Sequence, residues 1–107
     1  MKQYNKNEII NIIKKMKDCL NNNSNEFFEL HFLLYNIMYG DTDGRDNYLN
    51  LNESEINSLL DFVYDLDYVD QDIFDFLGKN INTDFYISEK KKMLALVNKV
   101  LQKLENK

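Results

Sequence analysis

Apolar residues recur at helical spacing along most of the chain, and no proline interrupts them. Glycine, the other strong helix breaker, occurs only three times in 107 residues. No segment convincingly shows the pattern of a strand. The sequence therefore predicts an all-α protein. Its first helix would span residues 6–21, where the i, i+3, i+4, i+7 pattern is followed by Ile9, Ile12, Ile13, Met16 and Leu20.

Two further helices are predicted before residue 67. The segment EFFELHFLLYNIMYG, residues 26–40, is apolar on nearly every face, which is typical of a central, buried helix, and Gly40 would cap its end. The next helix would begin near Glu53, since Asn52 and Glu55 have the spacing of an N-terminal capping box. Its predicted buried stripe consists of Ile56, Leu59, Leu60 and Val63.

The segment DFVYDLDYVDQDIFDF, residues 61–76, contains six aspartates and no basic residue. One continuous helix would place Asp67 on the stripe of Leu60 and Val63, where an unpaired carboxylate is costly. We therefore expect a break, with Asp67 capping a separate, shorter helix that ends at Gly78. The inward-facing residues of that helix would be Val69, Ile73, Phe76 and Leu77.

The last helix is predicted to begin after Ser88, which would serve as its N-cap. Its apolar stripe would comprise Met93, Leu96, Val97, Val100, Leu101 and Leu104. Neither an internal repeat nor a domain boundary is visible, and a chain of this length suits one domain. The expected architecture is an antiparallel bundle of four or five helices that forms a single helical domain over residues 1–107.

Composition limits the class of protein further. The single cysteine, Cys19, has no partner for an internal disulfide or a cysteine metal pair, and it is expected to fill the core. The N-terminus lacks a signal-peptide pattern, and no apolar stretch is long enough to cross a bilayer. We therefore expect a soluble, cytoplasmic protein that binds no membrane. The sequence leaves the oligomeric state open.

Catalytic machinery is not evident. The only histidine, His31, lies in the most apolar segment, where it is expected to be buried and satisfied by a neighbour. No histidine–serine, histidine–cysteine or histidine–glutamate arrangement is apparent that would supply a nucleophile and its base. The sequence therefore predicts a protein that is not an enzyme and that uses no cofactor.

The segment DTDGRDNYLNLNE, residues 41–53, resembles a calcium-binding loop. An EF-hand needs oxygen ligands at fixed positions of a 12-residue loop. Counted from Asp41, Asp43 falls at position 3, but Asp46 and Glu53 reach positions 5 and 12 only if Arg45 is treated as an insertion. An ordinary turn between two helices explains the same residues. We therefore predict no metal site, with calcium binding and an ion-responsive regulatory adaptor as the alternative.

The net charge of −5 hides a strong segregation of charge. Residues 1–22 and 89–107 are both lysine-rich, whereas residues 23–88 contain fourteen acids against one arginine and one lysine. So acidic a middle segment repels nucleic acid and attracts basic partners. The lysines of the last helix are expected to solvate its outer face. These charges predict a basic protein partner and no direct contact with nucleic acid.

The acids of residues 61–75 carry that prediction. Asp61 and Asp65 would lie one helical turn apart, an arrangement of like charges that stability alone does not favour. Solubility explains such charges in part; the functional interpretation is a rigid carboxylate array that stands in for nucleic-acid phosphates. The predicted partner-binding residues are Asp61, Tyr64, Asp65, Tyr68, Asp70, Asp72 and Asp75, with the two tyrosines as anchors.

Residues 30–105 resemble the colicin D immunity-type proteins in the order and type of their elements. The resemblance is carried by EINSLLDFVYDLD, an acidic helix, and by FYISEKKKMLALVNKVLQKL, the terminal helix. It implies a small acidic bundle that neutralises a cognate tRNA-cleaving toxin by occupying the toxin's positively charged active-site cleft. A phage-encoded inhibitor of a host defence nuclease would use the same physical mechanism, and the sequence does not separate the two.

Overall fold

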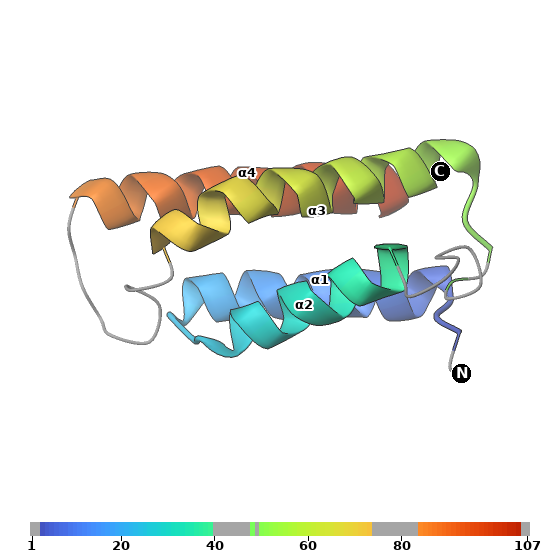
Figure 1. Cartoon of the computed structure of the whole chain (residues 1–107), viewed down its shortest axis with the longest axis horizontal. Coiled ribbons are helices and arrows are strands. Elements are labelled where there is room, and N and C mark those ends of the chain that lie inside the picture. Colours follow the sequence, from blue (N-terminus) through green and yellow to red (C-terminus); the bar gives the residue numbers. More distant parts are fainter. Residues whose placement is uncertain (1–2, 40–47, 49, 74–83, 106–107) are drawn as a thin grey trace.

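The computed structural model describes residues 3–39, 48, 50–73 and 84–105, with only the helical backbone described for 68–73. Within this part the chain forms four α-helices, and the prediction of an all-α bundle is confirmed (Figure 1). A single isolated bridge pairs Tyr4 with Tyr48. The helices are α1 (Lys6–Asn21), α2 (Glu26–Tyr39), α3 (Glu53–Ile73) and α4 (Asp84–Glu105).

The helices run alternately up and down the long axis, so each is antiparallel to the next in the chain (Figure 1). They form a closed ring in which α1 packs on α2 and α4, and α3 packs on α2 and α4. Within the described helices, the backbones of the diagonal pairs α1–α3 and α2–α4 do not pack directly against each other. This is the up-down-up-down arrangement of a four-helix bundle.

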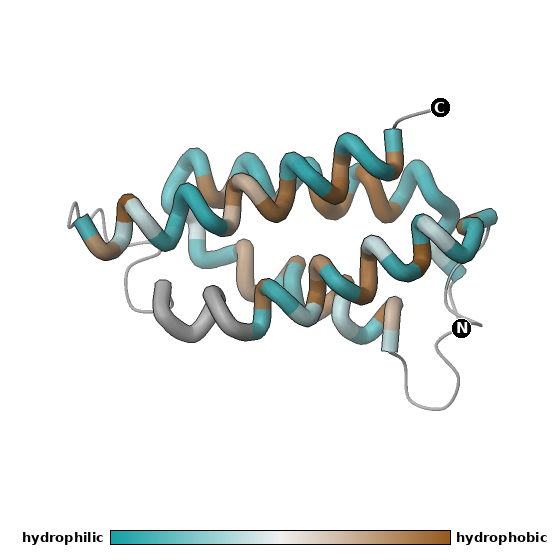
Figure 2. The backbone as a smooth tube through the Cα atoms, turned by 90° about the horizontal axis from the view of Figure 1, so that it is seen from above, coloured by the Kyte–Doolittle hydropathy of each residue, from teal (hydrophilic) through white to brown (hydrophobic). Residues whose placement is uncertain are grey.

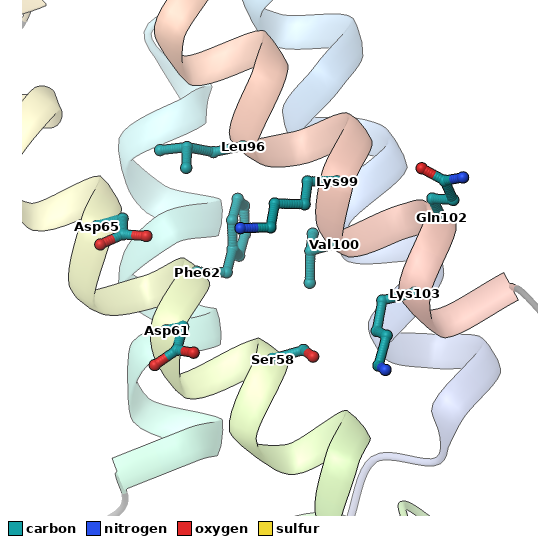
Figure 3. A pocket seen from close by; sticks show the side chains of 9 residues that line it. All are labelled: Ser58, Asp61, Phe62, Asp65, Leu96, Lys99, Val100, Gln102 and Lys103. Carbon is teal, nitrogen blue, oxygen red and sulfur yellow. The ribbon is translucent and has the colours of Figure 1, made fainter.

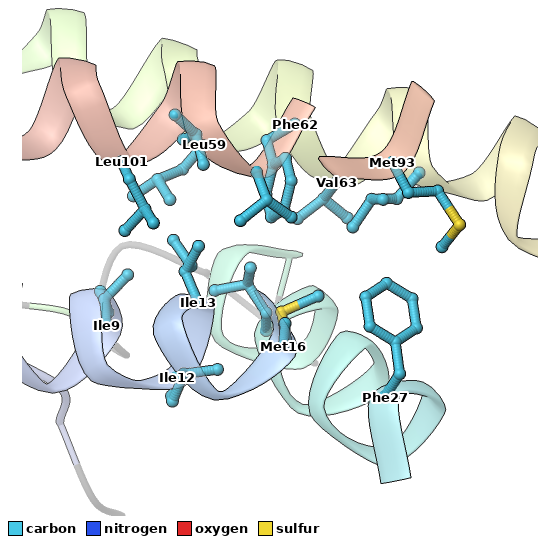
Figure 4. Packing of buried hydrophobic residues seen from close by; sticks show 14 of the residues in the cluster. Ile9, Ile12, Ile13, Met16, Phe27, Leu59, Phe62, Val63, Met93 and Leu101 are labelled. Carbon is cyan, nitrogen blue, oxygen red and sulfur yellow. The ribbon is translucent and has the colours of Figure 1, made fainter. Parts of the chain in front are cut away.

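The apolar face of each helix turns toward the middle of the ring (Figure 2). Ile9, Ile13 and Met16 of α1 meet residues of the other three helices there (Figure 4). Removing this surface from water is the main favourable term in folding. Among the described residues, the fully buried side chains are those of Ile9, Ile13, Met16, Leu20, Phe27, Leu34, Leu59, Val63, Leu66, Met93, Val97 and Leu104.

Two helices begin at reciprocal capping boxes. The predicted box at α3 is confirmed, since the Glu55 amide donates to Asn52 Oδ1 at 2.8 Å and the Asn52 amide donates to Glu55 Oε1 at 3.0 Å. Asn5 and Glu8 form the same motif at the start of α1, with distances of 2.8 and 3.2 Å. Each box satisfies amides that the first helical turn leaves without partners.

The end of α1 is fixed by Asn23, which adopts a left-handed conformation with φ of 55°. The Ser24 amide then donates to the Cys19 carbonyl at 2.8 Å. This is the hydrogen bond of a Schellman motif that spans six residues. The Tyr86 hydroxyl of α4 donates to Asn23 Oδ1. The polar run NNNSN, residues 21–25, thus ends α1 and also ties this turn to α4.

The prediction of a helix break at Asp67 is wrong, because α3 continues to Ile73. Its described buried residues include Leu59, Phe62, Val63 and Leu66, whereas Leu60 is only half-buried. The buried stripe is therefore rotated from the predicted one, and Asp67 lies at its edge with an exposed side chain. Gly40, Phe76, Leu77 and Gly78, together with the side chains of Val69 and Ile73, lie outside the described residues.

Replacing Tyr68 by proline tests the continuity of α3. In an unbroken helix the proline removes a backbone hydrogen bond and clashes with the preceding turn, so we expect a loss of about 3 kcal/mol in unfolding free energy. Urea denaturation measures this loss, with Tyr68→Ala as the control for the missing ring. If Asp67 were an N-cap, position 68 would be the first helical residue, where proline is well tolerated. A Tyr68→Pro variant as stable as Tyr68→Ala would therefore contradict the continuous helix.

The start of α4 also differs from the prediction. This helix begins at Asp84, so Ser88 lies inside it and is no N-cap. The five additional residues, 84–88, bring Tyr86 into the core, where it is 2% exposed, and Glu89 is buried as well. Met93, Val97, Val100, Leu101 and Leu104 are buried as predicted, and Leu96 is half-buried.

The prediction that α2 is buried on all sides is wrong as well. Phe27, Leu34, Ile37 and Met38 face the core, but Phe32 is 67% exposed. A helix in a four-membered ring contacts two neighbours and must present its remaining face to solvent. The exposed large side chains of this outer face are Phe32, Tyr35 and Tyr39.

Candidate functional site

The ring order converts the charge segregation of the sequence into two sides of the molecule. The acidic helices α2 and α3 are neighbours, and so are the lysine-rich helices α1 and α4. Helix α3 contains seven acids and α2 two, and neither contains lysine or arginine. Charges that were separated along the chain therefore face opposite directions in space, which gives the bundle a strong dipolar field.

Asp61 and Asp65 project from α3 into a groove that separates this helix from α4 (Figure 3). Both side chains are exposed, and they lie one turn apart as predicted. The groove has a volume of about 390 Å³, and Phe62, Leu96 and Val100 form part of its lining. The structure thus places these two predicted binding residues side by side on an accessible surface.

The opposite wall of this groove carries Lys99 and Lys103 of α4 (Figure 3). Within the described part of the chain, no ion pair joins either lysine to Asp61 or Asp65. From the sequence alone, these lysines are expected only to solvate the outer face of the last helix. Their position opposite the carboxylates depends on how α3 and α4 pair, and no local signal in either helix reveals it.

The other predicted partner-binding residues fall into two groups. Tyr64 is 55% exposed and lies on the outer face of α3 between Asp61 and Asp67. Tyr68, Asp70 and Asp72 belong to the helical backbone of α3, but their side chains lie outside the described residues. Asp75 lies wholly outside them.

Asp67 of α3 lies next to His31 of α2. His31 is 6% exposed, as the prediction of a buried histidine requires, and its Nε2 lies 3.3 Å from Asp67 Oδ1. The His31 ring also lies 6.3 Å from that of Phe27, between centroids. The sequence predicts Asp67 to be a helix cap, whereas in the structure it is part of the acidic surface at the seam where α2 and α3 meet.

Tyr35 and Tyr39 lie along the same seam, with ring centroids 4.9 Å apart. Burial raises the pKa of the Tyr39 phenol, and proximity to Tyr35 raises it further. The carboxylates of Asp67 and Asp61 act in the same direction. Negative charge from α3 therefore acts on Tyr39 of α2.

A buried carboxylate at the other end of α3 has a structural role. Glu55 is 6% exposed, and its Oε2 lies 2.5 Å from Lys6 Nζ. Burial alone would raise its pKa, but hydrogen bonds from Lys6 and the Asn52 amide outweigh this effect, with help from the Lys6 and Lys103 charges. The pKa of Glu55 consequently lies below its ordinary value of 4.5.

Glu55→Gln is expected to lower the unfolding free energy by about 1–2 kcal/mol at neutral pH, because the capping bond survives but the charged pair does not. A lowered folded-state pKa stabilises the protein above the unfolded-state pKa, and this contribution is lost as pH falls through the folded value. The difference in unfolding free energy between the wild type and the variant should therefore become smaller below about pH 4.5. Denaturation at several pH values measures it, with the exposed Glu53→Gln as control; a pH-independent difference would contradict the ion-pair explanation.

The structure bears in part on two further predictions, the buried cysteine and the calcium-like loop. Cys19 is buried in the core as predicted, and burial raises the pKa of its thiol despite an opposing hydrogen bond with Ser24. Of the calcium-loop candidates, Asp41, Asp43 and Asp46 lie outside the described residues, and Glu53 is the exposed first residue of α3. Among the residues that the structure describes, no group of three or more His, Cys, Asp or Glu could hold a metal ion.

No helix in the described part of the chain has the length and apolar character needed to cross a bilayer. Comparison with protein-family models, curated proteins and solved structures gives no match. The functional proposal therefore depends on the geometry and charge of this surface.

Proposed function

We propose that the protein is an acidic inhibitor that binds and blocks the basic active-site cleft of a nuclease. Its most specific form is the cytoplasmic immunity protein of a bacterial tRNA-cleaving toxin. The observation that carries this proposal is the exposed pair Asp61 and Asp65 on α3, a helix of 21 residues with seven acids and no base. Carboxylates held on a rigid helix offer a basic cleft the sign of charge that it normally receives from phosphates.

Folding does not explain the position of these two acids. Like charges at i, i+4 destabilise a helix by about 0.2–0.5 kcal/mol, and Asp61 and Asp65 have that spacing. Within the described residues neither forms an ion pair, and Lys99 and Lys103 on the opposite wall of the groove leave both carboxylates exposed. Their charges remain available to a partner.

The expected mechanism is fast electrostatic capture followed by steric exclusion. An acidic surface steers encounter with a cationic cleft and raises the association rate by about 10- to 1,000-fold, an effect that salt weakens. Once bound, the bundle occupies the volume that the RNA substrate would enter. Inhibition needs no chemistry from the inhibitor.

An immunity gene is expected to adjoin the gene of its toxin, so the test looks for a nuclease domain encoded there, purifies it and uses transfer RNA as its substrate. We expect the full-length protein to block cleavage, and we expect the association rate to fall steeply as salt rises from 50 to 500 mM (about 14 to 4 Å of Debye screening). A heat-unfolded sample of the same protein is the control. Cleavage that proceeds unchanged at saturating inhibitor, or association that is insensitive to salt, would overturn the proposal.

A further inference from the structure

Four large aromatic side chains are exposed on the α2–α3 side of the bundle. They are Phe32, Tyr35 and Tyr39 of α2, exposed by 67, 40 and 43%, and Tyr64 of α3, exposed by 55%. We call these four residues the aromatic face. The other large exposed apolar residues in the described part of the chain, Phe85 and Ile87, belong to α4. Tyrosine and phenylalanine are enriched in the centres of protein interfaces.

The aromatic face is continuous. Phe32, Tyr35 and Tyr39 follow the three- and four-residue spacing that aligns side chains along one helix. Tyr64 lies three residues before Asp67, whose carboxylate reaches the His31 ring. Because His31 is one turn before Tyr35, the stripe on α2 and Tyr64 on α3 border the same seam.

Charge decides what kind of partner this face suits. Asp61 and Asp67 are close enough to Tyr39 to raise the pKa of its phenol, after burial and Tyr35. Neither α2 nor α3 supplies a lysine or an arginine. On the other side of α3, Lys99 and Lys103 line the groove that Asp61 and Asp65 enter. A cationic surface that approached from α4 would meet these lysines, so the α2–α3 side is favoured.

We infer that the nuclease docks over the aromatic face and presents arginine to it. This inference rests on the proposed function and specifies the partner's footprint and chemistry. A guanidinium group stacks on a tyrosine ring and also forms two parallel hydrogen bonds with a carboxylate, which a lysine ammonium does not. Tyr35, Tyr39 and Asp67 offer both kinds of contact within one seam, and Phe32 offers apolar area to the side chains around the arginines.

The first test uses two synthetic helical peptides of equal charge, one with arginines on its polar face and one with lysines. We expect the arginine peptide to shift the amide resonances of Phe32, Tyr35, Tyr39 and Tyr64, and to bind several-fold more tightly than the lysine peptide. Shifts centred on Lys99 and Lys103, or equal affinity for both peptides, would overturn the inference. So would dimerisation of the free protein that shifts the same four resonances, because a second copy would then be the occupant.

The second test measures inhibition of the nuclease domain by Phe32→Ser with Tyr35→Ser. We expect inhibitory affinity to fall at least about tenfold, since each residue is placed as an interface anchor. Phe85→Ser removes an aromatic ring from α4 whose exposure, 49%, lies between those of Phe32 and Tyr35, and this variant should inhibit like the wild type. All the substituted side chains are exposed, and circular dichroism checks that each variant folds.

The two proposals fail separately. If the wild type inhibits the nuclease and the double variant inhibits equally well, the footprint is wrong and the function stands. If the wild type leaves the nuclease active while the arginine peptide maps to the aromatic face, the proposed function falls and the arginine-binding surface stands. If Phe85→Ser loses as much affinity as the double variant, the assignment to α2 is wrong.

Discussion

Reversing Asp61 and Asp65 together to lysine should slow association with the nuclease by about 10- to 1,000-fold at low salt. Both carboxylates are exposed on α3, and the replacement would put four cations around one groove with Lys99 and Lys103. The electrostatic attraction to a basic cleft would then become repulsion. Stopped-flow association at 50 mM salt measures the effect, and the loss should narrow as salt rises.

The matched control reverses two exposed acids elsewhere, Asp18→Lys with Asp84→Lys. Asp18 belongs to α1 and Asp84 to α4, so net charge changes by the same amount while the α2–α3 side is untouched. We expect this control variant to associate with the nuclease only slightly more slowly than the wild type. Equal losses in both double variants would show that net charge alone matters, and an unchanged inhibitory affinity in Asp61→Lys with Asp65→Lys would contradict the role of the carboxylate pair.

Phe27→Ala should lower the free energy of unfolding by about 3–5 kcal/mol, the usual cost of truncating a buried phenylalanine. The Phe27 side chain is fully buried, and its ring meets that of Phe28 edge-on at 5.8 Å. Truncation would leave a cavity in the core at the start of α2. Urea denaturation monitored by circular dichroism measures the loss, which is a large fraction of the stability of a small domain.

Phe32→Ala removes the same side chain from the outer face of the same helix. Because Phe32 is 67% exposed, its truncation should change the unfolding free energy by no more than about 0.5 kcal/mol. The two substitutions share their chemistry and their helix and differ only in the face. Similar effects from both would contradict the orientation of α2, on which the aromatic face depends.

Short-range chemistry made much of the fold predictable. The capping box of Asn52 and Glu55 involves residues three apart, so its partners can be identified without knowledge of the rest of the chain. The stripe of α1 is equally local, since Ile9, Ile13 and Met16 share one face whatever packs on it. The all-α class and the core positions of these residues follow from such signals.

The prediction was wrong for α3 because apolar residues on this helix are compatible with two different buried faces. In α3 the apolar residues surround most of the helix, and the choice between Leu60 and Phe62 as a core position depends on where α2 and α4 lie. The wrong choice made Asp67 look buried and suggested a helix break. Its actual neighbour, His31, belongs to another helix, so no spacing rule within α3 predicts the contact.

The sequence by itself determined the all-α class, the span of α1, the Asn52–Glu55 capping box and the presence of an acidic middle between two basic ends, because each depends on residues close along the chain. Only the tertiary structure decided that α2 and α3 share one side, that Lys99 and Lys103 oppose Asp61 and Asp65, and that the aromatic face borders Asp67. These relations depend on how helices pair and rotate in the ring. That choice is made by the burial of all four apolar faces at once.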